Sequence, residues 1–86
     1  MSSVEMYLTQ WCPYCAMAKR LLGEKGQQWT EIDIEADPAR RAEMMERSGR
    51  RTVPQIFVAD QHVGGYDELA ALEQAGELDA LLAGTG

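Results

Sequence analysis

The sequence predicts an α/β fold with a mixed sheet, one that contains both parallel and antiparallel strands. In the first half of the chain, a stretch of period-two alternation, a helical apolar stripe and a second alternating stretch follow one another. This strand–helix–strand order favours parallel pairing. Later, two short apolar runs flank a tight corner, which indicates an antiparallel hairpin. Because 86 residues leave room for one core, we expect a single domain over residues 1–86.

The first three elements are expected to be a strand, a helix and a strand. Apolar residues alternate with other side chains over residues 4–9, as in a strand with one buried face. Pro13 suits the first turn of a helix, and Gly26 is expected to end that helix. Over residues 30–35, apolar or β-branched residues alternate with acidic ones, which predicts a second strand with one solvent-facing side.

A second helix is expected to follow directly. Asp37 is a good N-cap, and Pro38 fits the first helical position. The Ser48-Gly49 pair indicates the end of this helix. The spacing of Ala42 and Met45 predicts that these two side chains lie on its inner face.

The remaining elements complete the sheet and add two helices. Residues 55–58 and 61–63 are expected to pair as a hairpin around the corner at 59–60. After two glycines, Asp67 is expected to cap a third helix. Leucines that follow Gly76 predict a short final helix.

The charge and the apolar runs exclude several classes of partner. Fourteen acidic and eight basic residues give a formal net charge of −6. This argues against sequence-independent binding of nucleic acid phosphates and against a polybasic patch on an anionic membrane. No apolar run approaches the roughly 18 residues of a membrane span, and the first residues do not resemble a signal peptide. We therefore expect a cytoplasmic protein with no nucleic acid or membrane partner.

Two cysteines stand where the first strand gives way to the first helix. A secreted domain of this size that relied on disulfides would usually carry four or more cysteines, so Cys12 and Cys15 are expected to be working groups. If Pro13 is the first helical residue, Cys12 is the N-cap, and its sulfur faces unpaired N–H groups that stabilise a thiolate. Cys15, one turn later, is expected to face the protein. The pattern predicts that Cys12 attacks a disulfide and Cys15 resolves the product.

Other uses of two cysteines fit less well. A structural zinc site needs four ligands, and His62 or a carboxylate supplies no second ligand pair, so we expect no metal site. Covalent haem attachment requires histidine after Cys15, where Ala16 stands. A structural disulfide that closes so short a loop would add little stability. An iron–sulfur cluster held by Cys12 of two chains remains an alternative.

Three motifs together resemble one family. Cys12-Pro13-Tyr14-Cys15, Thr52-Val53-Pro54 and Gly64-Gly65-Tyr66-Asp67, in this order and spacing, resemble a dithiol glutaredoxin of the bacterial glutaredoxin 3 type over essentially the whole chain. The resemblance implies a thioredoxin-like fold, with a four-stranded mixed sheet flanked by helices. It also implies a glutathione-dependent thiol–disulfide oxidoreductase that reduces protein disulfides and glutathione mixed disulfides, with glutathione as co-substrate and no bound cofactor.

The resemblance also implies site residues. It implies a cis peptide bond before Pro54, with the backbone of Val53 beside Cys12 to pair with an extended cysteine-containing peptide. The residues implied to bind glutathione are Tyr14, Thr52, Val53, Pro54, Gly65, Tyr66 and Asp67. The expected partners are glutathione and disulfide-containing or glutathionylated proteins, and the expected state is a monomer.

Two departures from the family pattern keep an alternative open. The family often has a lysine three residues before the first cysteine, where this chain has Thr9; Arg51 or Gln55 is expected to take its place. Trp11 precedes the first cysteine, as in thioredoxin. A thioredoxin-like reductase that receives electrons from a flavoprotein reductase is therefore the alternative enzyme, beside the iron–sulfur cluster carrier that Pro13 disfavours by family analogy.

Overall fold

The computed structural model describes residues 3–84, and its helices and strands follow the order expected from the sequence. The elements are β1 (Val4–Leu8), α1 (Pro13–Glu24), β2 (Thr30–Asp33), α2 (Pro38–Ser48), β3 (Gln55–Val58), β4 (Gln61–Gly64), α3 (Tyr66–Gln74) and α4 (Leu78–Ala83). None of these helices is long and apolar enough to span a membrane within the part of the chain described.

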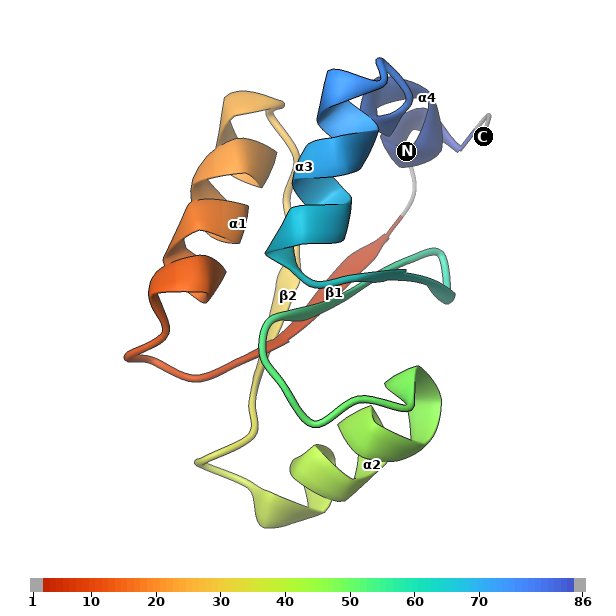
Figure 1. The fold of residues 1–86 in the computed structure, drawn as a ribbon. Helices are drawn as coiled ribbons and strands as arrows, with labels where there is room; N and C mark the ends of the chain where they lie inside the picture. The colour runs from red at the N-terminus through yellow and green to blue at the C-terminus, as the bar shows by residue number, and fades with distance from the viewer. Residues whose placement is uncertain (1–2, 85–86) are drawn as a thin grey trace.

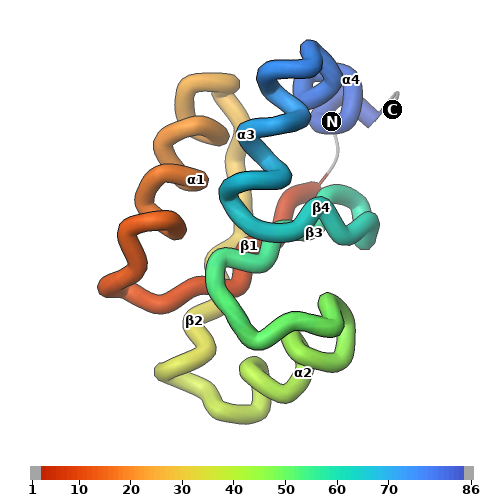
Figure 2. The backbone as a smooth tube through the Cα atoms, viewed as in Figure 1, coloured from red at the N-terminus to blue at the C-terminus, as the bar shows by residue number. Residues whose placement is uncertain are grey.

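The four strands form one mixed sheet in the order β2-β1-β3-β4. β1 pairs parallel with β2 and antiparallel with β3, and β3 pairs antiparallel with β4. Both expectations about strand direction are therefore confirmed. Figure 2 shows β3 and β4 as a tight pair, joined at a corner where Ala59 and Asp60 have φ of 49° and 68°. Two successive positive φ values suit the right-handed twist of a two-residue hairpin.

The helices cover both faces of the sheet. α1, α3 and α4 gather on one face, and α2 lies on the other (Figure 1). The first core, beneath α1, α3 and α4, consists of Val4, Met6, Leu8, Cys15, Ala18, Leu22, Ile56, Val58, Leu69, Leu78 and Leu82. The second core, beneath α2, consists of Tyr7, Ile32, Ile34, Met44 and Phe57. Because Cys15 belongs to the first core, the cysteine pair lies at the edge of a rigid, packed layer.

Two details of the strands differ from the sequence prediction. β1 is buried on both faces, since it lies between β2 and β3 with helices above and below, and Tyr7 is fully buried instead of facing solvent. β2 ends at Asp33, and not at residue 35, because the Asp33 carboxylate accepts hydrogen bonds from the N–H groups of Glu35 and Ala36 and turns the chain. Ile34 is nevertheless buried in the second core.

The predicted inner face of α2 is wrong for Ala42, whereas Met45 does contact the core. Met44, and not Ala42, is fully buried against the sheet, whereas Ala42 is exposed and Met45 packs at the margin of the second core. The ends of α2 are as expected: the Asp37 carboxylate accepts from the N–H of Ala39 at 3.1 Å, and the helix ends at a left-handed glycine. The apolar spacing alone allowed either set of residues to face inward.

The start of α3 also differs from expectation. Gly65 is the N-cap and Tyr66 is the first helical residue, so Asp67 lies in the first turn and does not cap the helix. Glu68 closes the turn instead, because its carboxylate accepts from the N–H of Gly65 at 2.7 Å. Gly64 has φ of 120°, a conformation that favours glycine, and leads the chain from β4 into this turn.

Candidate active site

The N-terminus of α1 holds the sulfur of Cys12 in the predicted position. Cys12 is the N-cap and Pro13 is the first helical residue. The backbone N–H of Cys15 donates to the sulfur of Cys12 at 3.2 Å. The half-buried Cys12 remains partly open to solvent, and both cysteines are free thiols. The sulfur of Cys12 therefore lies at the N-terminus of α1, reachable from solvent and bonded to a backbone N–H group.

Cys15 has the opposite environment. Only 1% of its surface is exposed, and it packs in the first core. Burial raises the pKa of the Cys15 thiol to about 12, and its hydrogen bond with Cys12 contributes in the same direction. The two thiols are therefore differentiated: one is accessible and held by an N–H donor, and the other is buried and kept protonated.

The loop of residues 52–54 brings the chain back to Cys12 from a distant part of the sequence. The Val53–Pro54 peptide bond is cis, as the resemblance implies. The carbonyl oxygen of Val53 lies 3.6 Å from the sulfur of Cys12, within reach of its S–H. The backbone of Val53 thus lies beside the reactive sulfur, where an extended peptide could pair with it.

A cavity of about 290 Å³ opens next to this loop. Its lining includes all seven residues implied to bind glutathione, namely Tyr14, Thr52, Val53, Pro54, Gly65, Tyr66 and Asp67. They come from the start of α1, the 52–54 loop and the start of α3, three segments that are far apart in the sequence. The structure therefore brings the predicted residues together in one place.

Two further residues line the same cavity, and the sequence analysis missed both. Arg50 and Glu68 are joined by a 2.6 Å ion pair across it. The N–H of Gly65 and the guanidinium of Arg50 hold the pKa of the Glu68 carboxyl below its usual value. The spacing from Gly65 to Glu68, three residues, is that of a capping box and could have identified Glu68.

Of the two residues expected to replace the missing lysine, Gln55 is turned inward, and the role of Arg51 stays a prediction. Gln55 is 1% exposed, and its amide donates to the carbonyl oxygen of Thr52 inside the protein. Arg51 is exposed but does not line the cavity, whereas its neighbour Arg50 does. A cation that does line the cavity, Arg50, stands one position before Arg51.

Exposed apolar side chains surround Cys12. Within residues 3–84, the large hydrophobic side chains that are exposed are Trp11 (90%), Tyr14 (57%) and Met17 (44%). A second cavity of about 330 Å³, between α1 and Tyr66, adjoins this patch and is lined in part by Met17. Exposed apolar side chains so close in the sequence to a reachable sulfur are candidates for contact with another molecule.

Over residues 3–84, the structure places no group of three or more histidine, cysteine, aspartate or glutamate side chains where they could hold a metal ion.

Comparison with known proteins decides the family. The glutaredoxin family model matches residues 4–63. The chain belongs to the glutaredoxin family. It is 52% identical over 82 residues to glutaredoxin 3 of Escherichia coli strain K12, which covers 95% of this chain and 99% of that protein. A glutaredoxin of Pseudomonas aeruginosa is also 52% identical over 82 residues, and the match covers 95% of this chain and 98% of that protein.

Solved glutaredoxin structures have the same fold. The solution structure of a glutaredoxin from Brucella melitensis superimposes with a TM-score of 0.84 at 57% identity, and the match covers 95% of this chain and 89% of that one. The crystal structure of a buckwheat glutaredoxin–glutathione complex superimposes with a TM-score of 0.90 at 26% identity. This match covers 99% of this chain and 80% of that one. The chain thus has the thioredoxin-like fold, and as a glutaredoxin it is a thiol–disulfide oxidoreductase.

Proposed function

We propose that this glutaredoxin uses glutathione to reduce glutathione mixed disulfides and protein disulfides, with Cys12 as the nucleophile and Cys15 as the resolving thiol. The observation that carries the proposal is the contrast between the two sulfurs. Cys12 is half-buried at a helix N-terminus and accepts an N–H hydrogen bond, whereas Cys15 is buried. A thiolate must be reachable to attack a disulfide, and only Cys12 meets this condition.

Removal of glutathione from a protein needs Cys12 alone. Its thiolate attacks the glutathione sulfur of a mixed disulfide, and the substrate leaves as a thiolate that takes up a proton. The Cys12–glutathione disulfide is then attacked by the thiolate of a second glutathione, which restores Cys12 and releases oxidised glutathione. In this second step the sulfur of Cys12 is the leaving group, and the N–H of Cys15 donates a hydrogen bond to it.

Reduction of a protein disulfide needs both cysteines. Cys12 attacks one sulfur of the substrate, and the other sulfur leaves as a thiol after protonation. Cys15 then attacks the sulfur of Cys12, expels the second substrate sulfur and forms a disulfide with Cys12. Since burial keeps Cys15 protonated, its proton must pass to the departing thiolate as the new bond forms. Two glutathione molecules return the pair to the dithiol state.

The cavity beside Val53 supports glutathione as the co-substrate. In this proposal the cysteinyl backbone of glutathione pairs with the backbone of Val53, and its γ-glutamyl carboxylate meets the free N–H groups at the start of α3. The carboxylate of Asp67, in the first turn of that helix, would receive the γ-glutamyl ammonium group. The relative solved in complex with glutathione adds support, since its fold superimposes over nearly the whole chain.

The proposal extends to partners and location. The substrates would be disulfide-containing or glutathionylated proteins that contact the exposed apolar patch around Cys12. Residues 1–86 would act as one glutaredoxin domain, as a monomer, in the cytoplasm. The net charge of −6 supports a role without nucleic acid or anionic membranes.

The decisive experiment compares electron donors. The protein is oxidised to its Cys12–Cys15 disulfide and then given either glutathione with glutathione reductase and NADPH, or thioredoxin reductase and NADPH. We expect rapid NADPH consumption only with glutathione. Reduction by thioredoxin reductase alone would assign the chain to the alternative, thioredoxin-like activity. Brown protein from an anaerobic preparation, with its cluster lost when Cys12 is replaced, would instead favour a cluster carrier.

A further inference from the structure

A chain of hydrogen bonds joins β4 to the 52–54 loop. The Nε2 atom of His62 lies 2.7 Å from Oε1 of Gln55. The amide nitrogen of Gln55 in turn donates to the carbonyl oxygen of Thr52 at 3.0 Å and to its hydroxyl oxygen at 3.3 Å. Of these three residues, only Gln55 is fully buried, at 1% exposure. Loss of His62 or Thr52 as its partner would therefore leave a buried polar atom of the Gln55 amide without a hydrogen bond.

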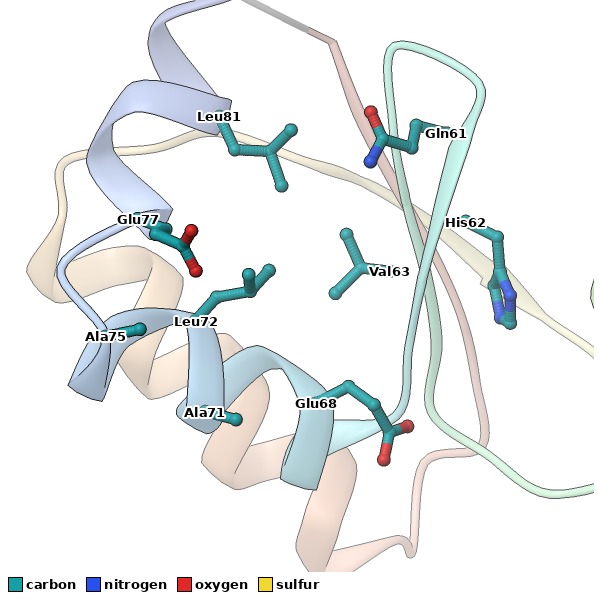
Figure 3. A pocket seen from close by; sticks show the side chains of 9 residues that line it. All are labelled: Gln61, His62, Val63, Glu68, Ala71, Leu72, Ala75, Glu77 and Leu81. Atoms are coloured by element: carbon teal, nitrogen blue, oxygen red, sulfur yellow. The ribbon is translucent and has the colours of Figure 1, made fainter. Parts of the chain in front are cut away.

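His62 is held in place by its own surroundings. Its ring lies against Phe57, with centroids 5.0 Å apart and planes at 37°. Figure 3 shows the side chains of His62 and Val63 on opposite sides of β4: Val63 points toward Leu72, and His62, which lies at the margin of the same cavity, points the other way. The imidazole therefore faces the second core and the buried amide of Gln55.

Chemistry determines the direction of every bond in this chain. A carbonyl oxygen can only accept, so the NH₂ group of Gln55 must face Thr52 and its Oε1 must face His62. Oε1 also can only accept, so Nε2 of His62 must carry a hydrogen. Burial, with a contribution from the cations of Arg50 and Arg47, lowers the pKa of His62 and favours the neutral ring, and the carboxylate of Glu68 acts in the opposite direction. The neutral ring is thus the Nε2–H tautomer, with a bare Nδ1.

The bond to Thr52 controls a backbone group at the active site. The carbonyl of Thr52 and the N–H of Val53 belong to one peptide unit, which is trans because the cis bond in this region is the one before Pro54. In a planar trans peptide these two groups point in opposite directions. When Gln55 holds the carbonyl toward the interior, the N–H of Val53 is directed away from it. The carbonyl oxygen of Val53 itself lies 3.6 Å from the sulfur of Cys12, so this N–H belongs to a residue beside the reactive sulfur.

We propose that His62 is a positioning residue of the active site: through Gln55 it fixes the Thr52–Val53 peptide, and so aims the backbone donor that pairs with the cysteinyl backbone of the substrate. His62 touches no reacting atom. Donation to the Thr52 carbonyl also polarises that peptide and makes the N–H of Val53 a stronger donor. The inference rests on the proposed function, since it requires a cysteine-containing backbone at Val53.

Kinetics on three variants test the proposal. His62→Phe keeps a ring against Phe57 but removes the donor. His62→Gln restores an N–H at the position of Nε2, and Gln61→Ala on the same strand is the control. The probe is a peptide–glutathione mixed disulfide, assayed with glutathione, glutathione reductase and NADPH. We expect His62→Phe to raise the KM for this substrate about three- to tenfold with little change in kcat, and His62→Gln to lie near the wild type.

The rate of Cys12 alkylation separates positioning from a general loss of structure. Alkylation of Cys12 is expected to be the same in all four proteins. An unchanged KM in His62→Phe, or an equal loss in His62→Gln, would overturn the proposal. Because His62→Phe leaves Oε1 of the buried Gln55 without a donor, its melting temperature is expected to fall; a change in Cys12 alkylation that accompanies the KM increase would overturn the proposal.

A measurement on the unmodified protein needs no substrate and no variant. Nitrogen–proton NMR spectra of the imidazole at pH 7.5 should show the neutral Nε2–H tautomer, with a proton protected by its bond to Gln55. The Nδ1–H tautomer would overturn the chain of bonds. If the wild type lacked glutathione-dependent activity while this tautomer was present, the proposed function would have failed and the hydrogen-bond chain would still hold.

Discussion

The backbone N–H of Cys15 donates to the sulfur of Cys12 across 3.2 Å, while the thiol of Cys15 is itself buried. One residue therefore serves the site twice, first through its backbone and then through its side chain. Replacing the side chain of Cys15 leaves the N–H donor in place. This separation allows the two proposed roles to be tested one at a time.

Serine substitutions should divide the two activities. Cys12→Ser is expected to abolish both the removal of glutathione and the reduction of protein disulfides, because no reachable thiol remains. Cys15→Ser should lose protein disulfide reduction but retain the removal of glutathione, which needs only Cys12. The measurement is NADPH consumption with a peptide–glutathione mixed disulfide and with a protein disulfide. Loss of both activities in Cys15→Ser, with neither lost in Cys12→Ser, would reverse the assignment.

The alkylation of Cys15 should be slow and should accelerate with alkaline pH. A thiol with a pKa of about 12 is ionised in roughly one molecule in 100,000 at pH 7, whereas an ordinary cysteine is ionised to a few per cent. In Cys12→Ser, burial still raises the pKa of Cys15. We therefore expect the rate of iodoacetamide labelling to keep rising above pH 9, as followed by mass spectrometry. A plateau below pH 9 would contradict this expectation.

Glu68 should make the stability depend on pH at the acidic end. Its pKa is lowered in the folded protein by the Gly65 N–H and by Arg50, so the unfolded chain binds the proton more readily. The stabilisation is present above the ordinary pKa of a glutamate and is lost as pH falls through the lower, native value. Glu68→Gln lacks this carboxylate. Urea unfolding should thus show a wild-type advantage at pH 6 to 7 that shrinks toward pH 3; a constant difference would argue against the ion pair.

Arg47 should stabilise the fold without contributing to catalysis. Its guanidinium lies 4.0 Å from the centre of the Phe57 ring, donates to the buried hydroxyl of Tyr7 at 2.7 Å and pairs with Glu5 at 3.3 Å. Arg47→Ala is expected to lower the free energy of unfolding by about 1–3 kcal/mol. The matched control is Arg41→Ala, an exposed arginine of the same helix. If both variants melted alike, these contacts would contribute nothing measurable.

Trp11 should matter for large substrates more than for small ones. Its indole is 90% exposed beside Cys12, where a folded substrate could cover it. We expect Trp11→Ser to reduce the kcat/KM for a protein disulfide several-fold and to leave the reaction with a small glutathione mixed disulfide nearly unchanged. Equal effects on both substrates would remove Trp11 from the contact surface and place its influence on Cys12 itself.

Local signals in the sequence predicted most of the fold. The starts and ends of α1 and α2 depend on neighbouring residues alone. The structure confirms the prolines at their first positions, the Asp37 cap and the left-handed glycines that follow them. The failures concern tertiary context. Tyr7 is buried because β1 lies in the middle of the sheet, a fact that alternation within one strand cannot reveal. Met44 rather than Ala42 faces the core because the orientation of α2 on the sheet decides it.

The candidate site was predictable to the extent that its residues lie in contiguous motifs. The three motifs around Cys12, Val53 and Asp67 contain all seven residues that were predicted to bind glutathione, and all seven line the cavity. Arg50 also lines the cavity but was not predicted to do so, because it is held there by an ion pair with Glu68, 18 residues away in the sequence. Gln55, one of the two residues expected to replace the missing lysine, is buried because β3 lies inside the sheet, between β1 and β4, which its neighbours in the sequence do not reveal.

The near-complete exposure of Trp11 has a practical consequence. The neighbouring Cys12 changes between thiol and disulfide, and indole emission is sensitive to a sulfur close by. The other tryptophan, Trp29, is half-buried, and its ring N–H donates to Glu31, so its emission should differ from that of Trp11. This arrangement gives the protein an intrinsic fluorescent reporter, through which single turnovers could be followed in a stopped-flow instrument without an added dye.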